Sequence, residues 1–117
     1  MELGVGGVIP THTHRTSEVL ILVKGSIIAG FIDTNNTAYY KKLQVGDVMI
    51  FPDGMLHFQV NVGDTLALAF VSLNGSNPAI QVVASSLFAS NLLTKLIEQT
   101  TLMSPEEVRR LKLFGIA

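Results

Sequence analysis

The side chains in this sequence best suited to metal chemistry are three histidines and one glutamate. His12 and His14 are separated by one residue, Glu18 follows closely, and His57 lies far along the chain. In an extended strand, residues two apart point to the same side, so the imidazoles of the His-Thr-His step share a face. Imidazole and carboxylate ligands together suit Mn, Fe, Zn, Ni or Cu. An isolated His-x-His pair is more often structural than metal-binding, so the rest of the chain has to decide.

Glu18 can reach these histidines only if the chain turns between them. In one continuous strand, its side chain would lie about 13 Å beyond His14, which is too far to share an ion. The intervening Arg15-Thr16-Ser17 segment contains a Thr-Ser pair that suits a turn. We therefore expect Glu18 to begin the next strand and to face the histidines across it.

The elements that would position these residues are short β-strands over about residues 1–83. Gly25, Gly46 and the Pro52–Gly54 segment supply turn signals between them. The expected strands are Glu18–Val23, Ser26–Ile32, Ala38–Leu43, Asp47–Phe51, Leu56–Asn61 and Leu66–Leu73. Short strands at regular spacing favour a β-sandwich or barrel, so we predict an all-β fold.

The last third of the chain, about residues 85–117, changes to a helical period. The first helix is predicted from a hydrophobic stripe formed by Leu92, Leu93, Leu96 and Ile97. A second helix is predicted to begin at Ser104-Pro105, with Glu107 completing a capping box and Gly115 marking the stop. Met103 and Val108 would form a hydrophobic staple at its start. We treat residues 1–117 as a single domain that ends in short C-terminal α-helices.

Composition excludes several classes of protein. The chain has 117 residues, of which 48% are hydrophobic and only 15% charged, with no cysteine and a net charge of −1. These values argue against disorder, thiol chemistry and nucleic-acid binding. Unbroken apolar runs such as Val19–Val23 are far shorter than the roughly 20 residues of a membrane span. High apolar content without a span favours a subunit of an oligomer.

Two segments of the chain resemble the two conserved motifs of the cupin superfamily. The first motif comprises Gly6, His12, His14, Glu18 and Gly25, and the second comprises Gly46, Pro52, Gly54, His57 and Asn61. The surrounding sequence resembles the germin-like proteins of plants over nearly the whole chain. We expect Asn61 to close a turn rather than to bind metal.

The resemblance implies a cupin β-barrel, or jelly-roll, that holds one Mn²⁺ ion on His12, His14, Glu18 and His57. It also implies a hexamer built as a trimer of dimers, and an extracellular location in the apoplast or cell wall. Some germin-like proteins have superoxide dismutase activity, which would make superoxide or another small anion the ligand. The resemblance identifies no catalytic residue beyond the metal ligands.

Other functions remain open. A germin-like protein could instead be a non-enzymatic wall component, a receptor or a nutrient-reservoir protein. Oxalate oxidase is less favoured because Ile9 stands where such germins carry an asparagine that binds substrate. A pocket for an auxin-like carboxylate could be lined by Phe51, Phe58 and Phe70, although aromatic residues on strands more often fill the core of such barrels.

The sequence departs from the family in two further respects. Only three residues separate His14 from Glu18, where many germins have four. The family usually has a signal peptide and an N-terminal segment with two cysteines, so we expect this chain to be a truncated form. Two glycosylation sequons, at Asn35 and Asn74, agree with the extracellular location that the resemblance implies.

Overall fold

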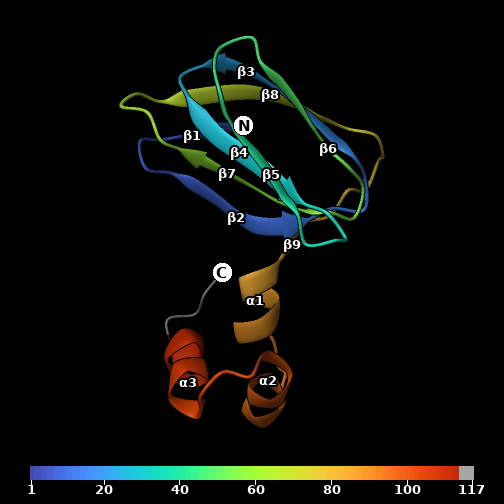
Figure 1. Cartoon of the computed structure of the whole chain (residues 1–117), viewed down its shortest axis with the longest axis vertical. Coiled ribbons are helices and arrows are strands. Elements are labelled where there is room, and N and C mark those ends of the chain that lie inside the picture. Colours follow the sequence, from blue (N-terminus) through green and yellow to red (C-terminus); the bar gives the residue numbers. More distant parts are fainter. Residues whose placement is uncertain (114–117) are drawn as a thin grey trace. The chain divides into compact units, whose positions relative to one another are not determined.

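The computed structural model of the chain describes residues 1–113 and divides into two compact units (Figure 1). The strand unit spans Met1–Ile80, and the helical unit begins at Gln81. The predicted all-β barrel with short C-terminal helices is confirmed.

The strand unit contains two antiparallel sheets. Its strands are β1 (Glu2–Leu3), β2 (Val8–Thr13), β3 (Glu18–Lys24), β4 (Ile27–Ile32), β5 (Ala38–Leu43), β6 (Val48–Phe51), β7 (Leu56–Asn61) and β8 (Ala67–Leu73). One sheet has the order β1-β8-β3-β6, and in the other β5, β4, β7 and β2 are neighbours in that order. The six predicted strands are confirmed to within one residue at each end, whereas β1 and β2 were not among them.

The pairing of the strands brings distant residues to one place. In the pairing of β2 with β7, His12 lies opposite His57, after a register irregularity between Ile9 and His12. In the other sheet, Glu18 is the first residue of β3 and pairs with Phe51 of β6. The two sheets therefore supply histidines from one side and the glutamate from the other.

The core of the strand unit lies on the inner faces of the sheets. Its buried residues are Leu3, Leu20, Leu22, Ile27, Ala29, Leu43, Phe51, Ala67 and Ala69. One expectation is wrong, because Phe70 is 72% exposed on β8, between the inward-facing Ala69 and the half-buried Val71. Phe58 is half-buried, so only Phe51 of the three phenylalanines is a fully buried core residue.

Turn residues fix the connections as the sequence predicts. Gly25 has φ +84°, and a Cβ there would lie 2.7 Å from the carbonyl oxygen of Leu66, so no other residue fits without distortion. Asn61 closes a turn, because its amide nitrogen donates to the carbonyls of Leu3, Gly4 and Thr65. The expected structural role of Asn61 is confirmed.

The helical unit contains β9 (Gln81–Val82), α1 (Val83–Phe88), α2 (Thr94–Thr101) and α3 (Pro105–Leu113). Phe88, Ile97 and Val108 form its buried cluster, and Leu92 and Met103 pack against it. Leu93 and Leu96 of the predicted stripe are instead 68% and 42% exposed. None of the helices in residues 1–113 is long and apolar enough to cross a membrane.

The start of α3 follows only half of the predicted capping box. The backbone nitrogen of Glu107 donates to the Ser104 hydroxyl at 3.3 Å, as predicted. The Glu107 carboxylate, however, accepts two hydrogen bonds from Arg110 rather than turning back to Ser104. The predicted helix stop at Gly115 lies outside the described residues.

Candidate metal centre

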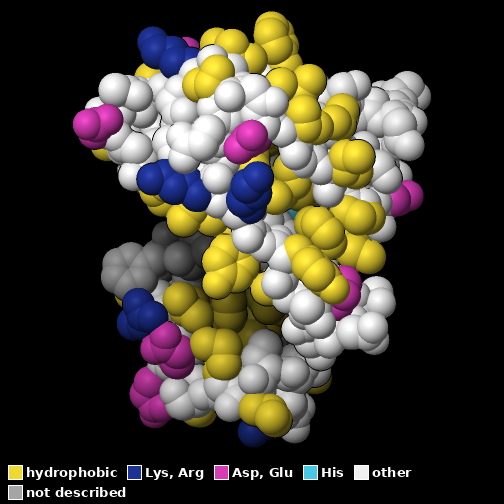
Figure 2. All heavy atoms as spheres, turned by 45° about the horizontal axis from the view of Figure 1, so that its top comes forward, with side chains coloured by type: hydrophobic (Ala, Val, Ile, Leu, Met, Phe, Trp, Pro, Cys, Tyr) yellow, Lys and Arg dark blue, Asp and Glu magenta, His cyan; other side chains and the backbone are white. Residues whose placement is uncertain are grey.

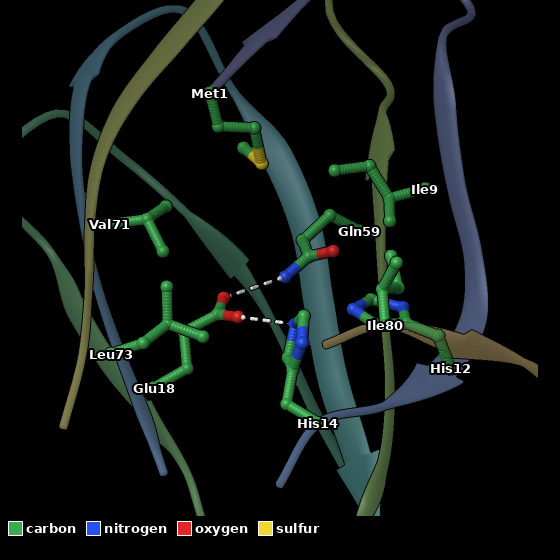
Figure 3. Close-up of a pocket in the computed structure, with 9 residues that line it drawn as sticks. All are labelled: Met1, Ile9, His12, His14, Glu18, Gln59, Val71, Leu73 and Ile80. Atoms are coloured by element: carbon green, nitrogen blue, oxygen red, sulfur yellow. Dashed lines mark hydrogen bonds and ion pairs between the residues drawn. The ribbon is translucent and has the colours of Figure 1, made fainter. Parts of the chain in front are cut away.

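Four polar side chains converge inside the strand unit, and Figure 3 shows three of them within the cavity. They are His12 and His14 at the end of β2 and just beyond it, Glu18 at the start of β3, and His57 in β7. One ligand atom from each residue lies within 4.8 Å of every other. The structure thus brings together all four residues that the sequence singled out.

The distances between these atoms fit a single ion. His14 Nε2 lies 3.1 Å and His57 Nε2 lies 3.5 Å from the same Glu18 oxygen, Oε1. Ligands that bind a divalent metal at about 2.0–2.2 Å lie about 3 Å from their neighbours when the angle between them is near 90°. The four atoms could therefore bind one ion after only small adjustments.

Backbone carbonyls set the tautomer of all three imidazoles. The Nδ1 atoms of His12 and His57 lie 2.7 Å from the carbonyl oxygen of Pro10 and 2.9 Å from that of Met55. His14 Nδ1 contacts the carbonyl oxygen of Ala79. A carbonyl only accepts, so each Nδ1 carries a hydrogen, and in the neutral ring the free lone pair is then on Nε2. His57 Nε2 is buried without a hydrogen-bond partner among the described residues. This is the environment expected of a nitrogen that binds a metal ion.

Burial favours the neutral, metal-binding form of His12. His12, Glu18 and His57 are buried, and in the space-filling view of Figure 2 hardly any histidine is visible. Desolvation lowers the pKa of His12 below its ordinary value, and the nearby His57 and His14 lower it further. The carbonyl of Pro10 and the charge of Glu18 oppose this shift. At neutral pH, His12 is therefore held in the form that binds a cation.

The turn between His14 and Glu18 is held by a distant segment that the sequence did not point to. The backbone nitrogen of Ser17 donates to Asn74 Oδ1 at 3.1 Å, and that of Arg15 donates to the Pro78 carbonyl at 2.8 Å. Ala79, whose carbonyl contacts His14, has a left-handed φ of +52°. The segment between β8 and the end of the strand unit thus sets the spacing of two candidate ligands.

A cavity of about 190 Å³ is lined by three of the four residues. Besides His12, His14 and Glu18, its lining residues are Met1, Ile9, Gln59, Val71, Leu73 and Ile80. Ile9 therefore forms part of the cavity wall. Gln59 is the polar lining residue that sequence reasoning missed, although its place two residues after His57 puts both side chains on one face of β7.

Phe51 supports the site from the core. Its ring stacks on the His57 imidazole, with centroids 4.6 Å apart and an interplanar angle of 21°.

The two predicted glycosylation residues, Asn35 and Asn74, are exposed.

The sequence of this chain is similar to a protein-family model and to several known proteins. A family model described as Cupin matches residues 1–109. Auxin-binding protein ABP19b of Prunus persica is 51% identical over 113 residues, covering 96% of this chain and 54% of that protein. Germin-like protein subfamily 3 member 3 of Arabidopsis thaliana is 50% identical with the same coverage. The chain spans about half the length of these curated relatives.

A likeness to solved structures extends over nearly the whole chain. A structure of oxalate oxidase superposes with a TM-score of 0.94 at 30% sequence identity, and the match covers 98% of this chain and 60% of that one.

Proposed function

The chain belongs to the cupin family and has germin-like homologues, and we propose that His12, His14, Glu18 and His57 hold one manganese ion. The observation that carries the proposal is the convergence of three imidazole Nε2 atoms and one carboxylate oxygen within 4.8 Å. Backbone carbonyls at all three Nδ1 atoms support it, because they orient the free lone pairs.

The donor set agrees with manganese but also with other divalent metals. Three imidazoles and one carboxylate, with no thiolate, suit Mn, Fe, Zn, Ni or Cu. The choice of manganese comes from the germin-like resemblance. On an octahedral ion, four protein ligands leave two positions for small molecules, which is what a catalytic centre needs.

The activity that we propose is superoxide dismutation, in which two superoxide anions and two protons become hydrogen peroxide and dioxygen. Manganese, when bound, would supply the one-electron redox chemistry. The protein's part is to hold the four ligands in place and to keep bulk water away with the apolar residues Ile9, Val71 and Leu73. The cavity of about 190 Å³ has room for a diatomic ligand.

Oxalate oxidation is a less favoured activity, despite the likeness to oxalate oxidase. Ile9 is half-buried in the cavity wall and offers no hydrogen-bond donor to a carboxylate. A dianion placed against this wall would lose water without gaining a partner, which costs about 1–3 kcal/mol for each unpaired buried polar group.

A non-enzymatic role is the alternative, as a receptor, a cell-wall component or a nutrient-reservoir protein. The name of one relative, auxin-binding protein ABP19b, favours a role in binding. The apolar cavity beside the proposed ion could accept the apolar part of a small carboxylate. The two roles differ in whether the bound metal accepts and turns over a small ligand.

We further propose that the protein works in the apoplast or cell wall as a homo-oligomer, with a hexamer of three dimers as the expected assembly. The outer face of the β8-β3-β6 sheet supports assembly, and Figure 2 shows hydrophobic side chains gathered on the strand unit. This face is formed by Val19, Ile21, Val23, Val48, Ile50, Leu68 and Phe70. Glycosylation at Asn35 and Asn74, both exposed, would accompany secretion.

The experiment that tests the proposal is the metal content of the purified chain, measured by plasma mass spectrometry. We expect close to one manganese per chain, and much less in the variant Glu18→Gln, which keeps the shape but removes the charge. A folded protein that takes up no transition metal would overturn the proposal. Assays with superoxide and with oxalate on the metal-loaded protein would then separate the two activities from the binding role.

A further inference from the structure

The segment that leads from β8 to β9 (Figure 1) contains an asparagine followed by a glycine, Asn74-Gly75. Of the asparagines in the sequence, Asn74 alone precedes a glycine. Both residues are exposed and lie outside the strands and helices. Because glycine has no Cβ, its backbone nitrogen can approach the side chain of the preceding asparagine with little steric hindrance.

An asparagine in this position can lose its side-chain amide without an enzyme. The backbone nitrogen of Gly75 attacks Cγ of Asn74, the bond from Cγ to Nδ2 breaks, and the proton of the attacking nitrogen leaves with the amide as ammonia. The product is a succinimide ring, which water opens at either of its carbonyl carbons. Opening at Cγ gives aspartate, whereas opening at the main-chain carbonyl gives isoaspartate, in which the main chain runs through the former side chain.

A hydrogen bond already present in the fold favours this attack. The backbone nitrogen of Ser17 donates to Asn74 Oδ1 at 3.1 Å, and that of Asn74 donates to the Ser17 carbonyl at 3.3 Å. Attack at Cγ moves negative charge onto Oδ1, and a donor already placed at that oxygen stabilises the charge. The folded chain thus presents the reacting carbonyl group in a polarised state.

The segment of residues 74–80 is attached at several points to the turn between His14 and Glu18. The contacts are the paired hydrogen bonds of Asn74 with Ser17, the bond from the Arg15 nitrogen to the Pro78 carbonyl, and the contact of the Ala79 carbonyl with His14. Gly75 lies so close to the turn that a Cβ on it would be 2.7 Å from Thr16 Cγ2. A change in the backbone of this segment is therefore passed on to the turn.

The two products would change the turn to different extents. Aspartate keeps the length of the main chain and an acceptor oxygen for the Ser17 nitrogen. Isoaspartate adds one carbon atom to the main chain before Gly75, and the former Oδ1 becomes a main-chain oxygen. The hydrogen bond to Ser17, the residue next to Glu18, is then lost or displaced.

We propose that Asn74-Gly75 is a site of spontaneous deamidation, and that its isoaspartyl product loosens the turn that positions Glu18. The site reacts where Asn74 carries no glycan, because a glycan would be attached to the leaving nitrogen. The covalent step is independent of any metal. Its effect on metal binding rests on the proposed function.

The test follows the unglycosylated, manganese-loaded chain during incubation at neutral and at mildly alkaline pH. Mass spectrometry of digests detects the replacement of an amide by a carboxylate, and fragment masses assign it to single residues. The internal controls are Asn77, whose neighbour Pro78 has no N–H with which to attack, and the exposed Asn91, which is followed by leucine. The isoaspartyl fraction is isolated by ion exchange, and Asn74→Asp serves as the reference for the aspartyl product.

We expect Asn74 to convert faster than Asn91, at a rate that rises with pH because the attacking nitrogen must lose its proton, and Asn77 to stay unchanged. The isoaspartyl fraction should bind manganese about two- to fivefold more weakly in calorimetric titration, as the loss of one hydrogen bond predicts. Its free energy of unfolding should fall as well. Asn74→Asp should bind manganese as the unmodified chain does.

The outcomes separate this inference from the proposed function. Conversion of Asn74 no faster than that of Asn91 overturns the inference, and so does an isoaspartyl fraction with unchanged manganese affinity and unchanged stability. Equal weakening in Asn74→Asp assigns the effect to charge and overturns the role of the lengthened main chain. A folded wild type that takes up no metal overturns the proposed metal site, whereas a lower stability of the isoaspartyl fraction still supports the loosening of the turn.

Discussion

The strand unit and the helical unit differ in what they bury. The strand unit buries nine hydrophobic residues in one cluster, and with them His12, Glu18, His57, Gln59 and Asn61. The helical unit buries Phe88, Ile97 and Val108, and among its described residues no polar side chain is buried. Only the larger core, built from strands far apart in the sequence, offsets the cost of desolvating a cluster of polar groups.

The two units also differ in how far apart along the sequence the residues lie whose interactions specify them. The helices follow from local signals, such as Ser104 and Pro105 before α3. The candidate site depends on cross-strand register, because a slip of one residue in β7 would turn His57 away from His12. Changes in the strand unit should therefore affect the site, and changes in the helical unit should have local effects.

The largest effect is expected from Phe51→Ala. Phe51 is fully buried and stacks on His57, so the variant leaves a cavity and removes a support of the site. We expect the free energy of unfolding of the strand unit to fall by about 3–5 kcal/mol. Denaturant unfolding measures this loss, and so does hydrogen exchange of the amides in β3 and β7.

Phe70→Ala is the matched control for Phe51→Ala. Phe70 lies on β8 of the same sheet but is 72% exposed, so its truncation should change the stability of the isolated chain by no more than about 0.5 kcal/mol. Equal losses in the two variants would contradict the assignment of inner and outer faces.

Removing the metal should have the next largest effect. If manganese is present at 100 times its dissociation constant, a chelator should lower the free energy of unfolding by about 2.7 kcal/mol, because the ion binds only the folded chain. Unfolding curves with and without chelator measure the difference. Glu18→Gln should show little dependence on chelator, whereas a wild type with identical curves would contradict a metal-stabilised strand unit.

The four candidate ligands could be predicted from the sequence because their types and spacing carry the signal. His12 and His14 alternate to one face of a strand, and a turn returns Glu18 toward them. The support of that turn by Asn74 and Pro78 could not be predicted, since it consists of contacts to backbone atoms across about 60 residues. Backbone contacts of this kind leave no characteristic residue pattern.

The face of β8 shows a different limit of sequence reasoning. Its inward residues Ala67 and Ala69 are small, and its outward residues Leu68 and Phe70 are large. When both faces of a strand are apolar, hydrophobic alternation does not reveal which one is inside. The register of β8 with β3 decides the matter, and that register is a property of the folded chain.

A smaller effect is expected from Asn74→Ala, which tests the support of the ligand turn. The variant removes the acceptor for the Ser17 backbone nitrogen, so we expect a loss of about 0.5–1 kcal/mol in stability and weaker manganese binding. Ser76→Ala is the control, because it destroys the same glycosylation sequon and leaves the Asn74 side chain in place. If both variants lose stability equally, the hydrogen bond to Ser17 contributes nothing and the sequon or its segment accounts for the change.

The smallest effect is expected in the helical unit, at the end of α2. Leu102 is 91% exposed and has a left-handed φ of +61°, a conformation that suits glycine and strains a leucine. Leu102→Gly removes this strain but adds freedom to the unfolded chain, so we expect a net gain of about 0.5 kcal/mol. Slower hydrogen exchange of the amides in α2 would measure the gain.

Leu96→Gly gives the opposite test with the same change of residue. Leu96 lies inside α2, where glycine costs up to about 1 kcal/mol because it loses more freedom on folding. The two variants should therefore shift the exchange of α2 amides in opposite directions, while the amides of β3 and β7 stay unchanged. If both variants speed exchange in α2, the strain at Leu102 is not what limits this helix. If the strand amides change as well, the effects of the helical unit are not local, and the contrast between the two units fails.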